Sequence, residues 1–287
     1  MKKLVFVLLV SLGIYGCSSV PITGRQQLNL VSDSEVLTLS LQEYNDYIKS
    51  AKKSTDATKT ALVNKVGKNI ANAVEAYYKV TGMESALDGY SWEFNLIEDS
   101  QVNAFCMPGG KIVVYTGILP YTQNETGLAV VLGHEVAHAV AKHSNERMSQ
   151  QVAAEYGAVA LDAVLGKASS TAKQLGQTVY GLGAQYGVML PFNRKQELEA
   201  DQLGLVFMGL AGYDPNQAIP FWERMSQQGG ATPEFMSTHP SDSHRIEQIR
   251  KELPAAMEYY NAAHGGNTNT KTNTNTKSTS TSNDWHF

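Results

Sequence analysis

Two histidines and a glutamate stand at a spacing that suits a metal site. His134, Glu135 and His138 lie in a largely apolar stretch, residues 128–143. If this stretch is helical, each residue advances about 100° around the axis, so His134 and His138 lie one turn apart on one face. Two imidazoles so placed can bind one zinc ion, and Glu135 beside them can accept a proton from a metal-bound water. The spacing therefore predicts a hydrolytic zinc site.

The residues around these three side chains favour a metal over a coincidence. The rest of the stretch is rich in apolar residues, so the helix should be buried: Ala129, Val130, Val131, Leu132, Val136, Ala137, Ala139 and Val140. Burying ionisable groups is costly unless something compensates their charge, and a cation does so. A core helix with two merely hydrogen-bonded histidines is the alternative.

A catalytic zinc ion needs three protein ligands and an open position, so one ligand must come from another segment. Glu197 and Glu199 compete for this role, and on a helix they point about 200° apart, so only one can face the metal. Asp201 lies on the same face as Glu197, where it can accept a hydrogen bond from the far nitrogen of a ligating histidine. We therefore predict Glu197 as the ligand and Glu199 as an exposed residue near the helix start. Gly204 continues the first face and would let this helix approach the one that carries His134.

Together these motifs resemble a known group of enzymes. The pair His134-Glu135-x-x-His138 and Glu197-x-x-x-Asp201 looks like the glutamate-zincin metallopeptidases of the CAAX prenyl protease and HtpX branch. The strongest likeness is to the mitochondrial Oma-type proteases and their bacterial lipoprotein relatives. It covers about residues 102–250 and includes further matching positions: Val102, Asn103, Ala104, Phe105, Gly109, Gly110, Val113, Gly117, Gly133, His143, Ser237, Thr238, His239, Pro240, Ser241, Arg245 and Ile246.

The resemblance implies a fold and a set of roles. The fold would be α+β, a mainly helical zincin-type metalloprotease domain with a small β-sheet. One Zn²⁺ per chain would be held by His134, His138 and Glu197, with Glu135 as general base. Asp201 would support a ligating histidine.

The same resemblance leaves three residues with open roles. His239 would approach the metal, to stabilise the oxyanion or to fill the open position in a resting state, or it would only anchor its loop before Pro240. Arg245 would steady the active-site loop or bind substrate carbonyls. His143 is expected to be structural rather than a ligand.

Two strands are predicted ahead of the zinc helix. Residues 92–98 alternate in polarity, and the β-branched run 111–115 follows a Pro-Gly-Gly turn. If the second strand has a free edge, an extended substrate can pair with it, which makes Ile112, Val113 and Val114 candidate substrate-binding residues. A strand in the middle of a small sheet is the alternative.

Helical spacing predicts packing elements elsewhere. The predicted helices cover residues 34–53, 58–79, 214–225 and 242–260, and a helical hairpin within residues 144–188 is broken near Gly166. None of these segments carries an uninterrupted apolar run of about 20 residues, the length that a membrane-spanning helix needs. Prenylated proteins are therefore doubtful substrates, because several relatives that process them are integral membrane enzymes.

The N-terminus has the pattern of a targeting segment. Lys2 and Lys3 precede an apolar run that is too short to span a bilayer, which predicts a secretory signal over residues 1–16. The end of this run resembles a bacterial lipobox with Cys17 as the lipidated residue; signal cleavage that leaves a free thiol is the alternative. Ser18 after the cysteine favours an exported lipoprotein in the outer membrane, facing the periplasm, by resemblance to other lipoproteins.

The predicted organisation has four parts. A signal at residues 1–16 and a tether at 17–33 precede the metallopeptidase domain at 34–262, and residues 263–287 form a tail. The tail is almost wholly Asn, Thr, Ser and Lys, which cannot bury enough apolar surface to fold.

Composition excludes some classes of protein. A formal net charge of −4 without basic clusters argues against nucleic-acid binding. With two cysteines in the chain, and Cys17 lipidated, no disulfide framework is expected. Cys106 would be a small packing residue or, alternatively, a latent inhibitor that binds the metal.

The sequence predicts a zinc endopeptidase that cleaves misfolded or misassembled cell-envelope proteins; the choice of substrate rests on the resemblance alone. A chaperone-like assembly factor with a capped, mostly latent zinc site is the alternative. A metal-free structural lipoprotein would require both motifs to be accidental.

Overall fold

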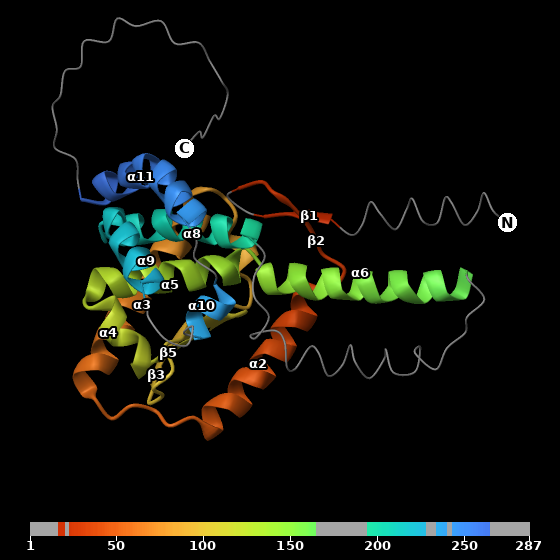
Figure 1. Ribbon diagram of the computed structural model, residues 1–287, viewed down its shortest axis with the longest axis horizontal. Coiled ribbons are helices and arrows are strands. Elements are labelled where there is room, and N and C mark those ends of the chain that lie inside the picture. The colour runs from red at the N-terminus through yellow and green to blue at the C-terminus, as the bar shows by residue number, and fades with distance from the viewer. Residues whose placement is uncertain (1–16, 21–22, 165–193, 228–233, 240–242, 265–287) are drawn as a thin grey trace, which may run out of the picture.

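The structure is a computed structural model of the 287-residue chain, and it describes residues 17–20, 23–164, 194–227, 234–239 and 243–264 (Figure 1). The predicted signal at residues 1–16, the helix break near Gly166 and most of the predicted tail lie outside the described residues. The mainly helical α+β architecture that the sequence predicts is confirmed.

Two helices form the centre of the fold. Helix α5 (Glu125–Val140) begins where the side chain of Asn124 accepts a hydrogen bond from the Gly127 N–H. Every residue of α5 from Gly127 onward is buried, as its apolar composition predicts. Helix α8 (Arg194–Leu210) packs directly against it.

The contact between α5 and α8 is a close approach of two backbones. A Cβ atom added to Gly133 would lie 2.8 Å from the carbonyl oxygen of Gly204. One added to Gly204 would lie 2.9 Å from the backbone nitrogen of His134. The predicted role of Gly204 is therefore confirmed, because a side chain at either glycine would push the two helices apart.

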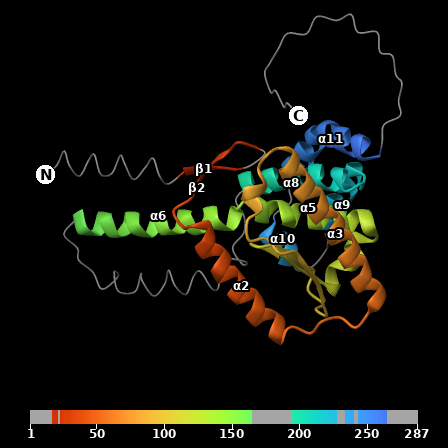
Figure 2. The same ribbon diagram turned by 180° about the vertical axis from the view of Figure 1, so that it is seen from behind.

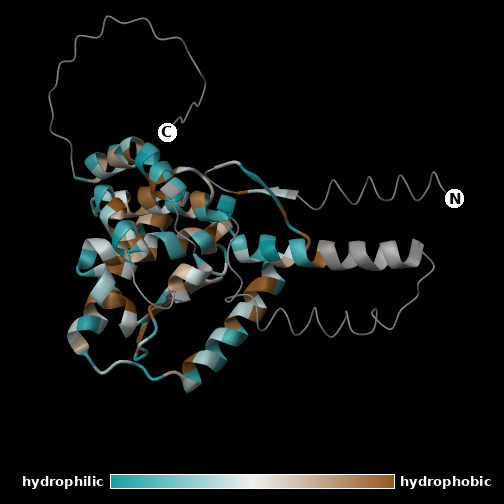
Figure 3. Ribbon diagram, in the orientation of Figure 1, coloured by the Kyte–Doolittle hydropathy of each residue, from teal (hydrophilic) through white to brown (hydrophobic). Residues whose placement is uncertain are grey.

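Further helices surround this pair, and Figures 1 and 2 show them from opposite sides. Helix α3 (Ala57–Val80) packs on α5 and on strand β3 (Glu93–Ile97). Helix α11 (Ser243–Ala263) packs on α8, and the short α9 (Ala218–Ser226) packs on α11 and α5. Figure 3 shows hydrophobic residues gathered in the stacked inner helices, whereas the outer α11 is largely hydrophilic. These elements and the remaining short helices have the bounds α3 (Ala57–Val80), η1 (Glu84–Leu87), η2 (Thr116–Ile118), α4 (Leu119–Thr122), η3 (Pro215–Gln217), α9 (Ala218–Ser226), α10 (Glu234–Thr238) and α11 (Ser243–Ala263).

A three-stranded sheet lies against the helices in the order β3-β5-β4. Strand β3 (Glu93–Ile97) pairs in parallel with β5 (Lys111–Tyr115), and β4 (Ala104–Met107) pairs with β5 in antiparallel orientation. The predicted free edge of the second strand is therefore wrong: β5 has a neighbour on each side. Its central residues Ile112, Val113 and Val114 are 0 % exposed, so we no longer assign them to substrate binding. Their continuous apolar run suits a strand buried on both faces.

The described part of the predicted tether contacts the domain. Within the expected tether, β1 (Cys17–Ser19) and β2 (Gln26–Leu28) form an antiparallel pair that leads into α2 (Asp33–Ser50). Beyond β2, the backbone N–H of Leu30 donates to the Ser149 hydroxyl, 2.9 Å away on α6 (His143–Val164). Figures 1 and 2 show α6 projecting from the helical core. The contact between Leu30 and Ser149 joins the predicted tether to α6.

The predicted helices 34–53, 58–79, 214–225 and 242–260 correspond to α2, α3, η3 with α9, and α11. Within the part of the chain that the structure describes, no helix combines the length and apolar character needed to cross a membrane.

The substitution Gly204→Ala tests the helix contact. In an open helix this change stabilises by about 1 kcal/mol, because alanine has the higher helix propensity. Here the new methyl group meets backbone atoms of α5, and overpacking of this kind costs about 1–3 kcal/mol. We therefore expect denaturant unfolding of the metal-free protein to show a lower free energy of unfolding. The control is Gln202→Ala, at a partly exposed position on the same helix, which should change the free energy of unfolding by less than about 0.5 kcal/mol. A Gly204→Ala protein more stable than the parent would contradict the contact.

Candidate metal centre and active site

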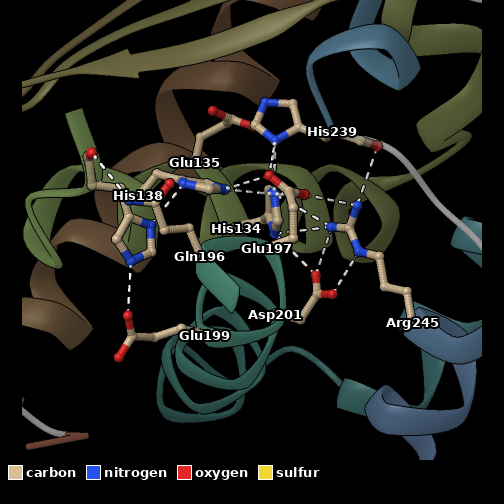
Figure 4. A network of polar contacts seen from close by, with 10 residues as sticks. His134, Glu135, His138, Gln196, Glu197, Glu199, Asp201, His239 and Arg245 are labelled. Atoms are coloured by element: carbon tan, nitrogen blue, oxygen red, sulfur yellow. Dashed lines mark hydrogen bonds and ion pairs between the residues drawn. The ribbon is translucent and has the colours of Figure 1, made fainter. Parts of the chain in front are cut away.

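Four buried side chains from three parts of the fold meet at one point (Figure 4). His134 and His138 come from α5, Glu197 comes from α8, and His239 directly follows α10. One nitrogen or oxygen from each residue lies within 4.8 Å of the others. The structure thus brings together the two histidines and the glutamate that the sequence predicts as ligands, and it places His239 beside them, as the resemblance implied.

The separations between these atoms fit a tetrahedral zinc ion. Zinc bonds of about 2.0–2.1 Å place neighbouring ligand atoms about 3.3–3.4 Å apart. His134 Nε2 lies 3.1 Å from His138 Nε2 and 3.2 Å from His239 Nδ1. Glu197 Oε1 lies 3.0 Å from His239 Nδ1 and 3.4 Å from His138 Nε2, and Glu197 Oε2 lies 3.5 Å from His134 Nε2. The donor set also suits zinc, since imidazole and carboxylate are among its usual ligands.

Glu135 lies beside this cluster, and one of its two carboxylate oxygens lacks a hydrogen bond to the described residues. It is 2 % exposed, and burial raises the pKa of its carboxyl group to about 7. The atom concerned is Oε1, and His239 Nε2 lies 3.4 Å from it. The backbone N–H of Cys106, on β4, also bonds to this carboxylate. A buried carboxylate with an unsatisfied oxygen is stabilised by a nearby cation, which is a second observation that fits a metal.

Asp201 and Arg245 contact the clustered side chains and fix their orientation. Asp201 Oδ1 lies 3.0 Å from His134 Nδ1, which leaves the Nε2 atom of that ring directed at the metal position. The Arg245 guanidinium donates two bonds to Asp201, of 2.6 and 2.8 Å, and its Nη1 lies 2.9 Å from Glu197 Oε2. The same Nη1 donates to the carbonyl oxygen of His239 at 3.2 Å, and the guanidinium stacks 3.7 Å above the Trp222 ring. Arg245 is 2 % exposed, so of its two predicted roles the geometry favours steadying the site over binding substrate carbonyls.

Glu199 lies where the sequence analysis did not expect it. It is 6 % exposed rather than solvated, and it does not belong to the metal cluster. His143 Nε2 lies 2.9 Å from its Oε2, and Arg25 Nε donates to the same atom at 2.7 Å. Arg25 precedes Glu199 by 174 residues, so no local pattern could have indicated this burial.

His143 and Cys106 both lie outside the metal cluster. His143 is not among the four clustered residues, in line with a structural role. Cys106 is half-buried, its Sγ contacts the Met107 carbonyl oxygen at 3.7 Å, and it too lies outside the cluster. The packing interpretation of Cys106 therefore suits the geometry better than metal binding.

Comparisons with known proteins agree with this geometry. The sequence pattern of peptidase family M48 matches residues 64–253. The chain is 37 % identical over 248 residues to the mitochondrial metalloendopeptidase OMA1 of Schizosaccharomyces pombe, which covers 83 % of this chain and 67 % of that protein. The protein of the same name from Saccharomyces cerevisiae is 34 % identical over 256 residues, covering 84 % and 70 %. The β-barrel assembly-enhancing protease of Escherichia coli is 30 % identical over 166 residues, covering 55 % of this chain and 34 % of that protein.

The comparisons contradict the predicted location. The relatives from two yeasts, a plant and human are mitochondrial metalloendopeptidases, not bacterial outer-membrane lipoproteins. The expectation of an exported lipoprotein in the outer membrane, facing the periplasm, is therefore wrong. It rested on a short apolar run before one cysteine, a pattern with little information. Lipidation of Cys17 itself stays a prediction, since its side chain lies outside what the structure describes.

All four clustered residues and Glu135 fall inside the matched region, and that region spans well over half of the chain. The match, the named relatives and the fit of the cluster to zinc lead to one conclusion. The chain belongs to peptidase family M48 and is a zinc metalloprotease.

Proposed function

We propose that this chain is an endopeptidase in which His134, His138 and Glu197 hold one Zn²⁺ and Glu135 is the general base. The observation that carries the proposal is the meeting of four ligand atoms within 4.8 Å, beside a buried carboxylate. Zinc, when bound there, would polarise the peptide carbonyl and make a coordinated water more acidic.

The roles of the chain's own residues follow from their positions. Glu135 accepts a proton from the attacking water at its carboxylate and passes it to the leaving amine. Both transfers are efficient when the pKa of the shuttle lies near the working pH. Burial raises the pKa of Glu135 above its ordinary value, whereas a bound cation lowers it. Asp201 orients His134, and Arg245 links Asp201, Glu197 and the backbone of His239 into one rigid frame.

We propose that His239 caps the centre at rest. With its Nδ1 3.2 Å from His134 Nε2 and 3.0 Å from Glu197 Oε1, the protein itself supplies four ligands. A catalytic zinc ion needs one position for water or substrate, so the imidazole of His239 must withdraw before cleavage. The other role that the sequence leaves open, donation to the oxyanion, requires the withdrawn imidazole to stay near the metal.

For substrates we propose misfolded or misassembled proteins, including those of the cell envelope. The support is the name of one relative, the β-barrel assembly-enhancing protease of Escherichia coli, of which the aligned region covers 34 %. A capped centre also suits an enzyme that must not cut folded proteins at random.

The second candidate is a chaperone-like assembly factor whose zinc site stays latent. The observation that favours this second candidate is that His239 belongs to the cluster as a fourth possible ligand. A zinc ion permanently capped by four protein ligands could not bind substrate.

The substitution Glu135→Gln distinguishes the two candidates. Glutamine keeps the size of the side chain but cannot accept the proton, so cleavage of an unfolded protein such as casein should fall by about 10²–10⁴-fold. Metal analysis should find one zinc per chain in both proteins, because Glu135 is not a ligand. Equal cleavage by both would exclude Glu135 as the base, and zinc in both with cleavage by neither would favour the latent assembly factor.

The substitution His239→Ala tests the cap. Freed of its internal competitor, the zinc ion should bind a small hydroxamate inhibitor at least about tenfold more tightly, which corresponds to about 1.4 kcal/mol. The measurement is the dissociation constant of the hydroxamate by calorimetry. His264→Ala, at an exposed histidine directly after α11, is the matched control and should leave the dissociation constant of the hydroxamate unchanged. An unchanged affinity in His239→Ala would argue that His239 does not occupy the open position.

A further inference from the structure

The two ligating histidines are held in different ways. His134 has the common arrangement, in which its Nδ1 faces a carboxylate, Asp201 Oδ1, at 3.0 Å. The Nδ1 of His138 instead faces another imidazole, with His143 Nδ1 at 2.8 Å. Both rings are buried, with His138 at 3 % and His143 at 0 % exposed.

This contact between two imidazoles constrains where the protons lie. One of the two Nδ1 atoms must donate and the other must accept, because they lie at hydrogen-bond distance. If His138 is to offer the lone pair of its Nε2 to the metal, its proton must be on Nδ1. His143 Nδ1 must then accept, and the proton of His143 must be on Nε2. The reverse arrangement would put a proton on His138 Nε2 and block metal binding.

The surroundings of His143 select the favourable arrangement. Its Nε2 lies 2.9 Å from Glu199 Oε2, and a carboxylate can only accept there. Glu199 in turn accepts bonds from Arg25 Nε, at 2.7 Å, and from the hydroxyl of Thr23. Figure 4 shows Glu199 on the side of the cluster away from Asp201 and Arg245.

Arg25 is itself held firmly. Its two terminal nitrogens donate to the two oxygens of Glu146, each at 2.8 Å, and Gln196 donates to Glu146 Oε2 at 2.8 Å. Arg25 lies in the connection between β1 and β2. Its bidentate pair with Glu146 joins the N-terminal strand pair to α6, and its bond to the buried Glu199 joins the pair to α8.

We propose that His143 is a positioning residue for the zinc ligand His138, and that Glu199 and Arg25 select the tautomer of His143 which permits metal binding. Zinc retention then depends on the N-terminal strand pair, although the four described residues of the metal cluster lie elsewhere in the fold. The proposal rests on His138 as a ligand in the proposed function, but it does not require peptide cleavage.

Zinc affinity of the full chain tests the proposal, measured by competition with a chromophoric chelator. His143→Phe fills the same space but cannot accept from His138, so its zinc dissociation constant should rise by about 10–100-fold. His143→Gln should restore affinity to within a few-fold, because its amide oxygen can accept from His138 while its amide nitrogen donates to Glu199. Arg25→Met should weaken binding in the same direction by a smaller factor.

Two controls separate positioning from packing. Lys65→Met removes an exposed ion pair, with Glu125, that lies outside this network, and it should leave zinc affinity unchanged. The melting temperatures of the metal-free variants report how far each substitution changes the stability of the fold without zinc. If His143 only filled space between helices, the Phe variant would bind zinc as tightly as the parent, which would overturn the proposal. Equal weakening in the Phe and Gln variants would overturn it too.

Zinc binding and peptide cleavage by the parent chain are measured separately, so failure of the peptidase proposal can be distinguished from failure of the role of His143. A parent chain that binds zinc but cleaves nothing would remove the peptidase proposal, and the ranking of the zinc affinities would still decide the role of His143. A parent chain that binds no zinc would overturn both.

Discussion

The burial of charge between α5 and α8 is the constraint on which the rest of the structure depends. His134, Glu135, His138, Glu197 and Asp201 are each no more than 5 % exposed, on two helices whose backbones touch at Gly133 and Gly204. Such a concentration of ionisable groups is tolerated only when charges and hydrogen bonds balance one another. Arg245 supplies one cation from within the chain, and a zinc ion is the second that the geometry accommodates.

This requirement explains why parts distant in the sequence converge here. Helix α11 contributes Arg245, which reaches Asp201 and Glu197 and also holds the backbone of His239. The N-terminal strand pair contributes Arg25, which neutralises Glu199 and Glu146 on the far side. The two arginines thus support opposite sides of the cluster. The sheet supplies a backbone N–H from Cys106 to Glu135, so each layer of the fold has a contact with the centre.

The sequence could predict features that depend on local geometry. Helix periodicity places His134 and His138 on one face, and it shows that only one of Glu197 and Glu199 can face the metal. The position of Asp201 on the face of Glu197 then favoured Glu197. Features that depend on distant partners were not predictable. The run around Val113 is equally apolar in an edge or a central strand, and Glu199 gains its partner from Arg25. The resemblance implied that His239 approaches the metal, but it left the role of His239 open. The location failed for another reason: a lipobox-like pattern is too short to identify a compartment.

X-ray absorption at the zinc edge of the resting, full-length protein would test the central claim most directly. A buried centre formed by His134, His138, Glu197 and His239 predicts one zinc per chain with four nitrogen or oxygen neighbours at about 2.0–2.1 Å, three of them showing the outer-shell scattering of imidazole. A protein that keeps its fold but binds no zinc, or a zinc ion with sulfur among its neighbours, would contradict the account.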